Sequence, residues 1–149
     1  MILHDFKVFP RTGRLIGIDW GARRTGVAVS DESREFVFAR SPIVACGTDE
    51  LVRAVVELVV AEKVVGIVIG LPLRMDGSES DTTKMVRRFA DALLAVTDIP
   101  IVFIDETLSS TAAAEEMGCA TVRDIKEKLD SNAARVILEN AIDLMARNN

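Results

Sequence analysis

The spacing of apolar residues changes partway along the chain. Between residues 14 and 44, short apolar runs are separated by turn residues at 21–25 and 31–33, which predicts strands joined by tight turns. We expect three strands, spanning residues 14–20, 26–30 and 36–44, with Pro42 interrupting the third. Short strands in immediate succession favour an antiparallel meander.

From residue 48 onward, apolar residues recur every three or four positions, a spacing typical of amphipathic helices. It predicts helices over residues 48–62, 81–96 and 129–147, and a short helix from Ser109 or Ser110 to residue 117. The residues expected to face inward are Leu51, Val55, Leu58 and Val59 in the first helix, Met85, Phe89, Ala92, Leu93 and Val96 in the second, and Ala133, Ile137, Ala141 and Leu144 in the last. Two continuous apolar runs, at 64–71 and 101–105, predict strands buried on both faces, as in a parallel sheet.

A meander followed by strands that alternate with helices predicts a mixed α/β fold. The sheet should have five strands, three in the antiparallel meander and two parallel, with helices on both faces. The chain has no repeat, low-complexity tract or linker that would divide it. We therefore expect a single domain over residues 14–149, preceded by an N-terminal extension over residues 1–13.

The composition excludes several kinds of chemistry. The chain has one histidine, His4, before the first predicted strand, and two cysteines, Cys46 and Cys119, which form no CxxC pair. Histidine-assisted nucleophiles and His-rich zinc sites are therefore disfavoured, and any acid–base or metal chemistry should fall to Asp, Glu, Lys or Cys. So few cysteines fit a reducing compartment, and no apolar run reaches the length of a membrane span. We expect a cytoplasmic protein.

The net charge of −5 argues against a protein that coats nucleic acid without specificity. The charge is uneven, however. The first 24 residues hold five basic and two acidic side chains, a local charge of +3, which leaves −8 for the remainder. A local basic rim on an acidic body is compatible with this distribution.

Acidic residues lie at the ends of two predicted strands and at the start of the last predicted helix. Asp19 ends the first apolar strand, Asp105 and Glu106 end the last one, and Asp130 lies at the start of the final helix. Carboxylates near the core of a sheet cost desolvation energy unless they are paired or bind a metal, and the ends of parallel strands are where sites collect. Carboxylates converging there would suit Mg²⁺ or Mn²⁺, and two such ions can activate a water and stabilise a leaving phosphate oxygen.

Each of these acids also has a purely structural interpretation. Asp19 can start the turn that contains Gly21, and Asp130 can cap the last helix. Asp105 and Glu106 can form a solvated strand end. Only their joint placement in one fold favours a site.

The basic residues likewise have two interpretations. Arg23 and Arg24 lie in a turn bounded by glycines, and Arg74 lies in the loop after the fourth predicted strand, so all three could contact substrate phosphates or be solvated. Lys84, Arg87 and Arg88 share one helix face and could meet a polyanion or only water. The phenylalanines are assigned to the core; they are Phe6, Phe9, Phe36, Phe38, Phe89 and Phe103.

Four segments of the chain together resemble the YqgF/RuvX family. They are GIDWGARRTGVAVSD at 17–31, VIGLPLRMDG at 68–77, DETLSS at 105–110 and LDSNAA at 129–134. They occur in the family's order and spacing and cover residues 14–144. The resemblance implies a ribonuclease H-like fold of the RuvC type and a nuclease that matures the 5′ end of precursor 16S ribosomal RNA.

The family's acidic positions fall on Asp19, Glu106 and Asp130, which the resemblance implies as catalytic carboxylates that bind Mg²⁺ or Mn²⁺. Arg23, Arg24 and Arg74 would bind the substrate. Thr107 stands where the family usually has an arginine, so a guanidinium that could hold a phosphate or the neighbouring carboxylate is absent. Arg23 or Arg24 is a candidate to replace it.

The sequence is therefore compatible with three functions. The first is a metal-dependent endonuclease acting on structured RNA, with precursor ribosomal RNA or the ribosomal subunit as partner. The second is a resolvase of four-way DNA junctions, which would need two active sites and hence a homodimer. The third is a non-catalytic factor that associates with ribosomes or nucleic acid and retains the fold. We expect a monomer or homodimer with no membrane partner.

Overall fold

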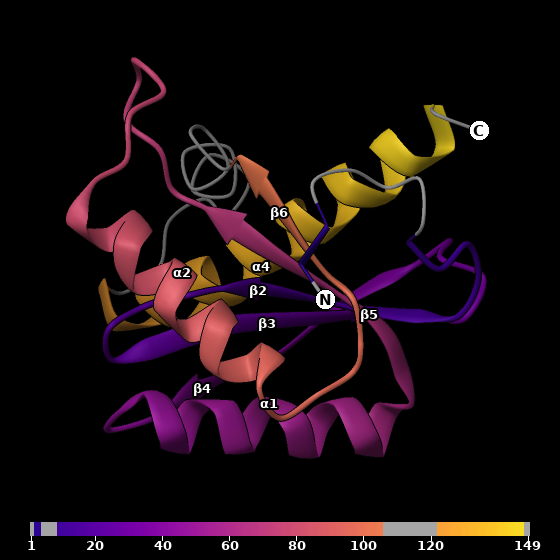
Figure 1. The fold of residues 1–149 in the computed structure, drawn as a ribbon, viewed down its shortest axis with the longest axis horizontal. Coiled ribbons are helices and arrows are strands. Elements are labelled where there is room, and N and C mark those ends of the chain that lie inside the picture. Colours follow the sequence, from indigo (N-terminus) through magenta and orange to yellow (C-terminus); the bar gives the residue numbers. More distant parts are fainter. Residues whose placement is uncertain (1, 4–8, 106–121, 148–149) are drawn as a thin grey trace.

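The computed structural model describes residues 2–3, 9–105 and 122–147, and of residues 2–3 and 122–131 it describes only the backbone. Within these ranges the chain forms one sheet of six strands in the order β1-β6-β5-β2-β3-β4 (Figure 1). The strands are β1 (Ile2–Leu3), β2 (Arg14–Asp19), β3 (Arg24–Ser30), β4 (Val37–Val44), β5 (Val64–Leu71) and β6 (Ile101–Asp105). The helices are α1 (Thr48–Glu62), α2 (Asp81–Leu94) and α4 (Val122–Arg147).

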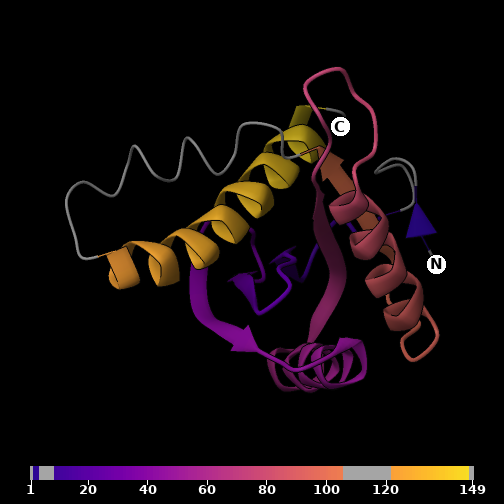
Figure 2. The same ribbon diagram turned by 90° about the vertical axis from the view of Figure 1, so that its left-hand side faces the viewer.

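The mixed sheet predicted from the sequence is confirmed. β2, β3 and β4 form the antiparallel meander, while β5 pairs parallel with both β2 and β6. Figure 2 shows α4 on one side of the strands, with α1 and α2 on the other side. Helices therefore cover both faces, as strands buried on both sides require.

Two hydrophobic clusters fill the spaces between the sheet and its helices. Ile16 and Ile18 of β2 point toward α1 and α2, whereas Leu15 points toward Ile137 and Leu138 of α4. This division follows from the alternation of side chains along a strand. The central strand β2 therefore contributes to both clusters, and its carboxyl end lies between the two helical layers.

The sixth strand comes from the segment predicted as an N-terminal extension. Ile2 pairs with Ile101 at the edge of β6, and Phe9 is only 3% exposed. The Phe9 ring occupies the space above Gly66, where an added Cβ would lie 2.5 Å from Phe9 Cζ. Parts of residues 1–13 thus pack against the domain. The boundary at residue 14 stays a prediction.

The meander departs from the predicted strands at the start of β3 and at Pro42. β3 begins at Arg24 rather than at residue 26, and β4 continues through Pro42. The register between the two strands shifts between Thr25 and Val27, which marks a β-bulge. Pro42 lies in β4, the outermost strand, opposite this bulge, where the missing N–H interrupts no regular ladder.

Some predicted core positions are wrong. Met85 and Val96 are 38% and 59% exposed, while Val86 and Ala90 are buried in α2. The buried face is shifted because Thr83 lies fully inside, where its Oγ1 donates a hydrogen bond to the carbonyl of Pro72. Corrections of the same kind apply to two phenylalanines and one leucine. Phe36 is 61% exposed, Phe38 48% and Leu144 41%.

The last helix begins at Val122 rather than at the predicted residue 129. Five of its first seven residues, VRDIKEK, are charged, and the sequence prediction overlooked that Val122 and Ile125 continue the helical spacing of Leu129. The predicted short helix over 109–117, like Phe6, lies outside the described residues. None of the described helices combines the length and apolar character needed to cross a bilayer.

Candidate active site

The carboxyl ends of β2, β5 and β6 lie at one edge of the sheet. Ile18 pairs with Ile69, Ile69 pairs with Phe103, and Leu71 pairs with Asp105. Because these strands are parallel, the residues that follow them start from the same edge. Two of the four acidic residues singled out in the sequence, Asp19 and Asp105, are thereby placed at this edge.

Asp19 is the last residue of β2 and lies opposite Gly26 of β3. Its side chain is half-buried. Leu15 faces α4, so the alternation along β2 also turns Gly17 and Asp19 toward α4. The carboxylate of Asp19 therefore belongs to the layer between the sheet and α4.

Gly17 allows α4 to approach the strand closely. A Cβ at this position would lie 2.8 Å from Leu138 Cβ and 2.9 Å from the carbonyl oxygen of Ala134. Such distances are shorter than any side chain tolerates, so a larger residue would push α4 away. The separation of α4 from Asp19 is thus set by a glycine two residues earlier.

The direction of α4 relates Asp130 to Asp19. Arg34 Nη1 lies 3.7 Å from Met145 Sδ, and Arg34 Nε donates to the carbonyl of Gly13 at 2.9 Å. Since Gly13 immediately precedes β2, the end of α4 lies near the start of β2, and the two elements run antiparallel. Asp130 is therefore displaced from Ala134 toward the end of β2 that carries Asp19.

The distance from Gly17 to Asp19 along β2 is similar to the distance from Ala134 to Asp130 along α4. Two residues of a strand advance about 7 Å and four residues of a helix advance about 6 Å. The backbone of Asp130 is thus expected to be roughly level with Asp19. Because α4 begins at Val122, Asp130 lies in its interior, and the interpretation of Asp130 as a helix cap is wrong.

The last strand supplies the third acidic position. Val102 and Ile104 face the α4 layer, whereas Asp105 alternates to the other face and is exposed. Glu106 follows it in the sequence and lies outside the described residues. Among the side chains that the structure describes, no three of His, Cys, Asp and Glu are grouped so that they could hold a metal ion.

The donor chemistry of these positions fits a hard cation. The described member, Asp19, offers carboxylate oxygen, and Glu106 and Asp130 would offer the same atom type. Mg²⁺ and Mn²⁺ prefer such oxygens, and neither of the softer donors, imidazole and thiolate, is among the three. The donor atoms of the three residues therefore match the metals that the sequence suggested, Mg²⁺ or Mn²⁺.

The turn after Asp19 is closed tightly. A Cβ on Gly21 would lie only 2.0 Å from the carbonyl oxygen of Arg24, so only glycine fits there. Buried Thr25 spans the turn, since its Oγ1 lies 3.4 Å from Gly21 N and 3.5 Å from Gly21 O. Arg23 is exposed at the tip, and Arg24 is half-buried at the start of β3.

Arg74 lies on a second ordered turn at the same edge. Its N–H donates to the carbonyl of Ser78 at 2.9 Å, and its carbonyl accepts from Gly77 N at 2.8 Å. Gly77 has a φ of 85°, a conformation that favours glycine. Asp76 Oδ1 accepts from Ser78 Oγ and Ser78 N, and these hydrogen bonds lower the pKa of Asp76. The side chain of Arg74 is exposed on this turn.

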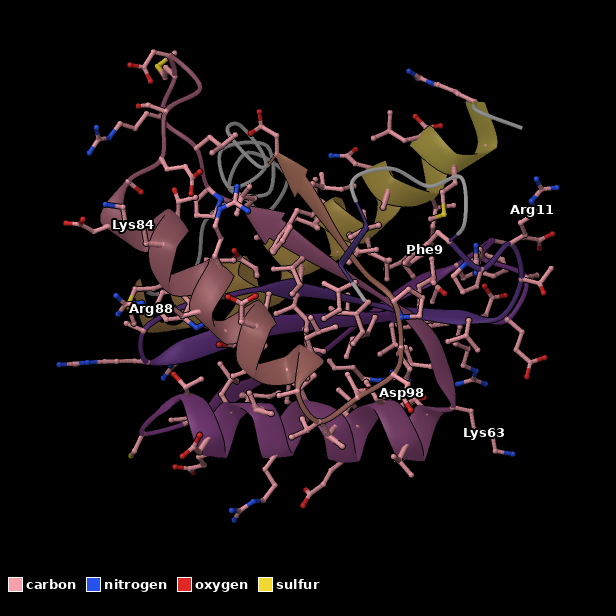
Figure 3. The ribbon with its side chains drawn as sticks, in the orientation of Figure 1. Phe9, Arg11, Lys63, Lys84, Arg88 and Asp98 are labelled. Carbon is pink, nitrogen blue, oxygen red and sulfur yellow. The ribbon has the colours of Figure 1, made fainter. Side chains whose placement is uncertain are left out.

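The three basic residues of α2 do not form one uniform face. Arg87 Nε lies 2.7 Å from Glu79 Oε1, and the guanidinium stacks 5.5 Å from the centre of the Phe103 ring. Figure 3 shows Lys84 and Arg88 at the side of the molecule where β2 turns into β3. Arg88 Nη1 lies 4.0 Å from Met85 Sδ. Arg87 therefore supports the loop before α2, while Lys84 and Arg88 lie at the edge of the candidate site.

Sequence reasoning missed a pocket beside this edge. It has a volume of about 140 Å³ and lies between the turn after β2, the start of α1 and Met85. The sequence carried no direct signal for it, because its lining residues come from separate segments and Met85 was assigned to the core. Trp20, which directly follows Asp19, also lines it.

Comparisons with known proteins identify the family. The family model RuvX, described as Holliday junction resolvase, matches residues 13–144. A protein of Maridesulfovibrio salexigens named "Putative pre-16S rRNA nuclease" is 42% identical over 128 residues, which are 85% of this chain and 95% of that protein. A protein of the same name from Sphingopyxis alaskensis is 41% identical over 146 residues, 96% of this chain and 95% of that protein.

The fold is also found in a solved structure. Thermus thermophilus RuvC in complex with a Holliday junction substrate superimposes with a TM-score of 0.55 at 13% sequence identity, over 91% of this chain and 96% of RuvC. The predicted ribonuclease H-like architecture of the RuvC type is thus confirmed. From the match over residues 13–144 and these close relatives, we conclude that the chain belongs to the RuvX (YqgF) family, whose curated members are named as nucleases.

Proposed function

We propose that this protein is a metal-dependent endonuclease that cleaves structured RNA and matures the 5′ end of precursor 16S ribosomal RNA. The observation that carries the proposal is the half-buried carboxylate of Asp19 at the end of the central strand, turned toward the helix that contains Asp130. The names of the curated relatives support the choice of substrate. With such a substrate, the reaction belongs in the cytoplasm.

Asp19, Glu106 and Asp130 are the proposed ligands of Mg²⁺ or Mn²⁺. When bound, divalent ions supply activation of a water nucleophile and stabilisation of the leaving phosphate oxygen. The protein contributes a rigid position for Asp19, because β2 is paired on both sides and packed on both faces. A carboxylate held in this way loses little conformational entropy when it binds a cation.

The arginines around this edge are the proposed phosphate contacts. Arg23 and Arg24 lie on the turn after Asp19, and Arg74 lies on the turn after β5. Both turns are fixed by glycines and hydrogen bonds, so their arginines project from defined backbones. Contacts of this kind orient a nucleic-acid strand without reading its sequence.

The direct test is cleavage of a precursor 16S ribosomal RNA fragment in Mn²⁺ by the native protein and by Asp19→Asn. We expect the variant to lose at least 100-fold in rate, since the change removes a charge from the metal site but keeps the shape. Asp98→Asn is the matched control, because Asp98 is exposed in the loop before β6, away from the carboxyl ends of the strands (Figure 3). Equal cutting by native protein and Asp19→Asn would overturn the proposal.

A four-way DNA junction is the second candidate substrate. The description of the matching family model and the substrate bound to Thermus thermophilus RuvC favour it. Symmetric cutting of two strands needs two active sites, so this function predicts a homodimer in gel filtration. Junction cleavage by a dimer, with the precursor RNA left intact, would replace the RNA proposal by this one.

A further inference from the structure

The pocket beside Asp19 has an apolar floor and a basic rim. Its apolar walls come from three separate segments of the chain, with Trp20, Ala45, Leu51 and Met85 among the lining residues. Arg23 lines it as well, and Lys84 and Arg88 flank Met85 on α2. A planar apolar group with an attached negative charge is the kind of ligand that such a combination recognises.

The size of the pocket restricts the ligand further. Its volume of about 140 Å³ is close to that of an engineered cavity of about 150 Å³ that takes up benzene. One six-membered ring therefore fits, which suits a pyrimidine. The ribose and phosphate would remain at the mouth, where Arg23 is exposed.

The position of the pocket relates it to the candidate active site. Trp20 packs with the cluster under α1 and α2, whereas Asp19 faces α4. These two adjacent residues lie at the same edge of the sheet, with Cα atoms about 3.8 Å apart. If a phosphate of the substrate lies at Asp19, the nucleotide that reaches the pocket is therefore close to that phosphate and not a distant part of the substrate.

The acidic residues near the pocket also favour an orientation in which the phosphate lies beside Arg23. Asp49 and Glu50 lie in the first turn of α1, and Glu50 Oε2 accepts a hydrogen bond from Cys46 N at 3.0 Å. These carboxylates would repel a phosphate on the α1 side. The phosphate is thus directed toward the part of the pocket that Arg23 lines.

We propose that this pocket binds the base of one unstacked pyrimidine nucleotide of the substrate strand, close to the phosphodiester that is cut. The inference rests on the proposed nuclease function and adds to it a contact outside the carboxylates. Stacking on aromatic side chains is a common way to hold an unpaired base. The base would stack on the indole of Trp20, and Met85 would contact it from the facing wall.

Trp20 makes the proposal directly measurable, because it is the only tryptophan in the chain. We would titrate the native protein with tetrauridylate in EDTA and follow the tryptophan fluorescence, so that no cleavage occurs. An abasic tetranucleotide of the same charge is the reference ligand. Saturable quenching by tetrauridylate, with at least fivefold less by the abasic strand, is expected from base stacking.

Substitutions at Met85 test whether this pocket is responsible. Met85→Glu should weaken the binding of tetrauridylate by about tenfold, whereas Met85→Leu keeps the wall apolar and should stay within about twofold of native. Val60→Glu is the control for the added charge, because Val60 is 71% exposed on the outer surface of α1, beyond the pocket-lining residues. Equal quenching by the abasic strand, or unchanged affinity of Met85→Glu, would overturn the proposal.

The outcome is separable from that of the nuclease test. If the native protein cuts RNA but shows no base-dependent quenching, the pocket proposal fails and the nuclease proposal stands. If quenching depends on the base and on Met85 while no cutting occurs in Mn²⁺, the nuclease proposal fails. Because Met85 lies partly on the surface, circular dichroism should give all three variants the native spectrum.

Discussion

Gly17 determines how closely α4 packs against the central strand. The Cβ that any other residue would add meets a side chain on one side and a backbone carbonyl on the other. A flexible side chain can move aside, but the carbonyl of Ala134 is fixed by the helix. The strain of a substitution would therefore be relieved by moving α4, which also carries Asp130.

We predict that Gly17→Ala destabilises the protein by ~1–3 kcal/mol, as overpacking of a core does. Urea unfolding followed by circular dichroism measures this change. Gly47→Ser is the matched control, because a Cβ at Gly47 meets nothing within 4 Å and serine suits the N-cap position of α1. Its stability should equal or exceed that of the native protein. A fully stable Gly17→Ala would contradict the close packing of α4.

Asp31 shows how a single exposed residue makes stability depend on pH. Its pKa is lowered from 3.8, first by the hydrogen bond from Ser33 Oγ and then by that from Phe36 N. The stabilisation is complete above pH 3.8, where the carboxylate is ionised in both the folded and the unfolded chain. It is lost as the pH falls through the lower pKa of the folded state.

Asp31→Asn should therefore lose stability relative to native protein above pH 4, and the difference should shrink below pH 3.8. Thermal unfolding at a series of pH values from 2 to 6 measures it. Asp98→Asn serves as the comparison, since Asp98 is likewise exposed. A difference between native protein and Asp31→Asn that stays constant over this range would show that ionisation is not involved.

Among the secondary-structure elements, α2 has the most clearly defined start. Ser80 and Thr83 form a reciprocal capping box, in which Ser80 Oγ accepts from Thr83 N and Thr83 Oγ1 accepts from Ser80 N. The same Thr83 hydroxyl reaches the carbonyl of Pro72. One threonine thus ties the helix to the end of β5, which positions the loop that carries Arg74.

Ser80→Ala should cost ~1 kcal/mol of stability, the usual loss for an N-cap side chain. Thermal unfolding provides the measurement. Thr82→Ala is the internal comparison, because Thr82 is exposed in the first turn of α2 and takes no part in the capping box. If both substitutions cost the same, the capping bonds contribute nothing and the start of α2 is held by packing alone.

At this scale the sequence predicted most elements and failed where tertiary structure intervenes. The first helix, 48–62, is reproduced because its apolar stripe packs on the sheet without interruption. The inner face of α2 was misassigned because a buried threonine takes an inward position that its polarity concealed. The start of α4 was missed because five of its first seven residues are charged, which masked the helical spacing of Val122, Ile125 and Leu129.

The same physics limits what the sequence says about the site. The apolar strands that end at Asp19 and Asp105 could be predicted because buried parallel strands have continuous apolar runs. The approach of Asp130 could not, since it depends on Gly17 and on the antiparallel direction of α4. The pocket at Trp20 was equally hidden, because residues from three separate segments line it.

Over the whole molecule, the negative net charge restricts how RNA can be bound. An overall charge of −5 repels a polyanion, so attraction must come from the basic edge formed by a few residues. Arg23, Arg24 and Arg74 would neutralise about three phosphates. The salt dependence of binding should therefore be shallow, with a slope of about −2 in a double-logarithmic plot for single-stranded RNA.

Replacing Arg74 by glutamine should reduce the magnitude of this slope by about 0.7, since one phosphate contact is lost. Fluorescence anisotropy of a labelled single strand in EDTA, at 50–300 mM KCl, gives the slope. Arg11→Gln is the matched control, because Arg11 is exposed near the start of β2, at the opposite edge of the sheet (Figure 3). An unchanged slope for Arg74→Gln would remove Arg74 from the interface.

The short strand β1 has a consequence for self-association. An open sheet exposes a row of unpaired amide and carbonyl groups at each border, and these groups can recruit strands from other chains into fibrils. β1 covers β6 along Ile2 and Leu3, and at the other border Pro42 and the bulge disrupt a regular row on β4. Removing the first residues would uncover an apolar strand, so a truncated chain should be prone to aggregate through β6 while the intact chain is protected.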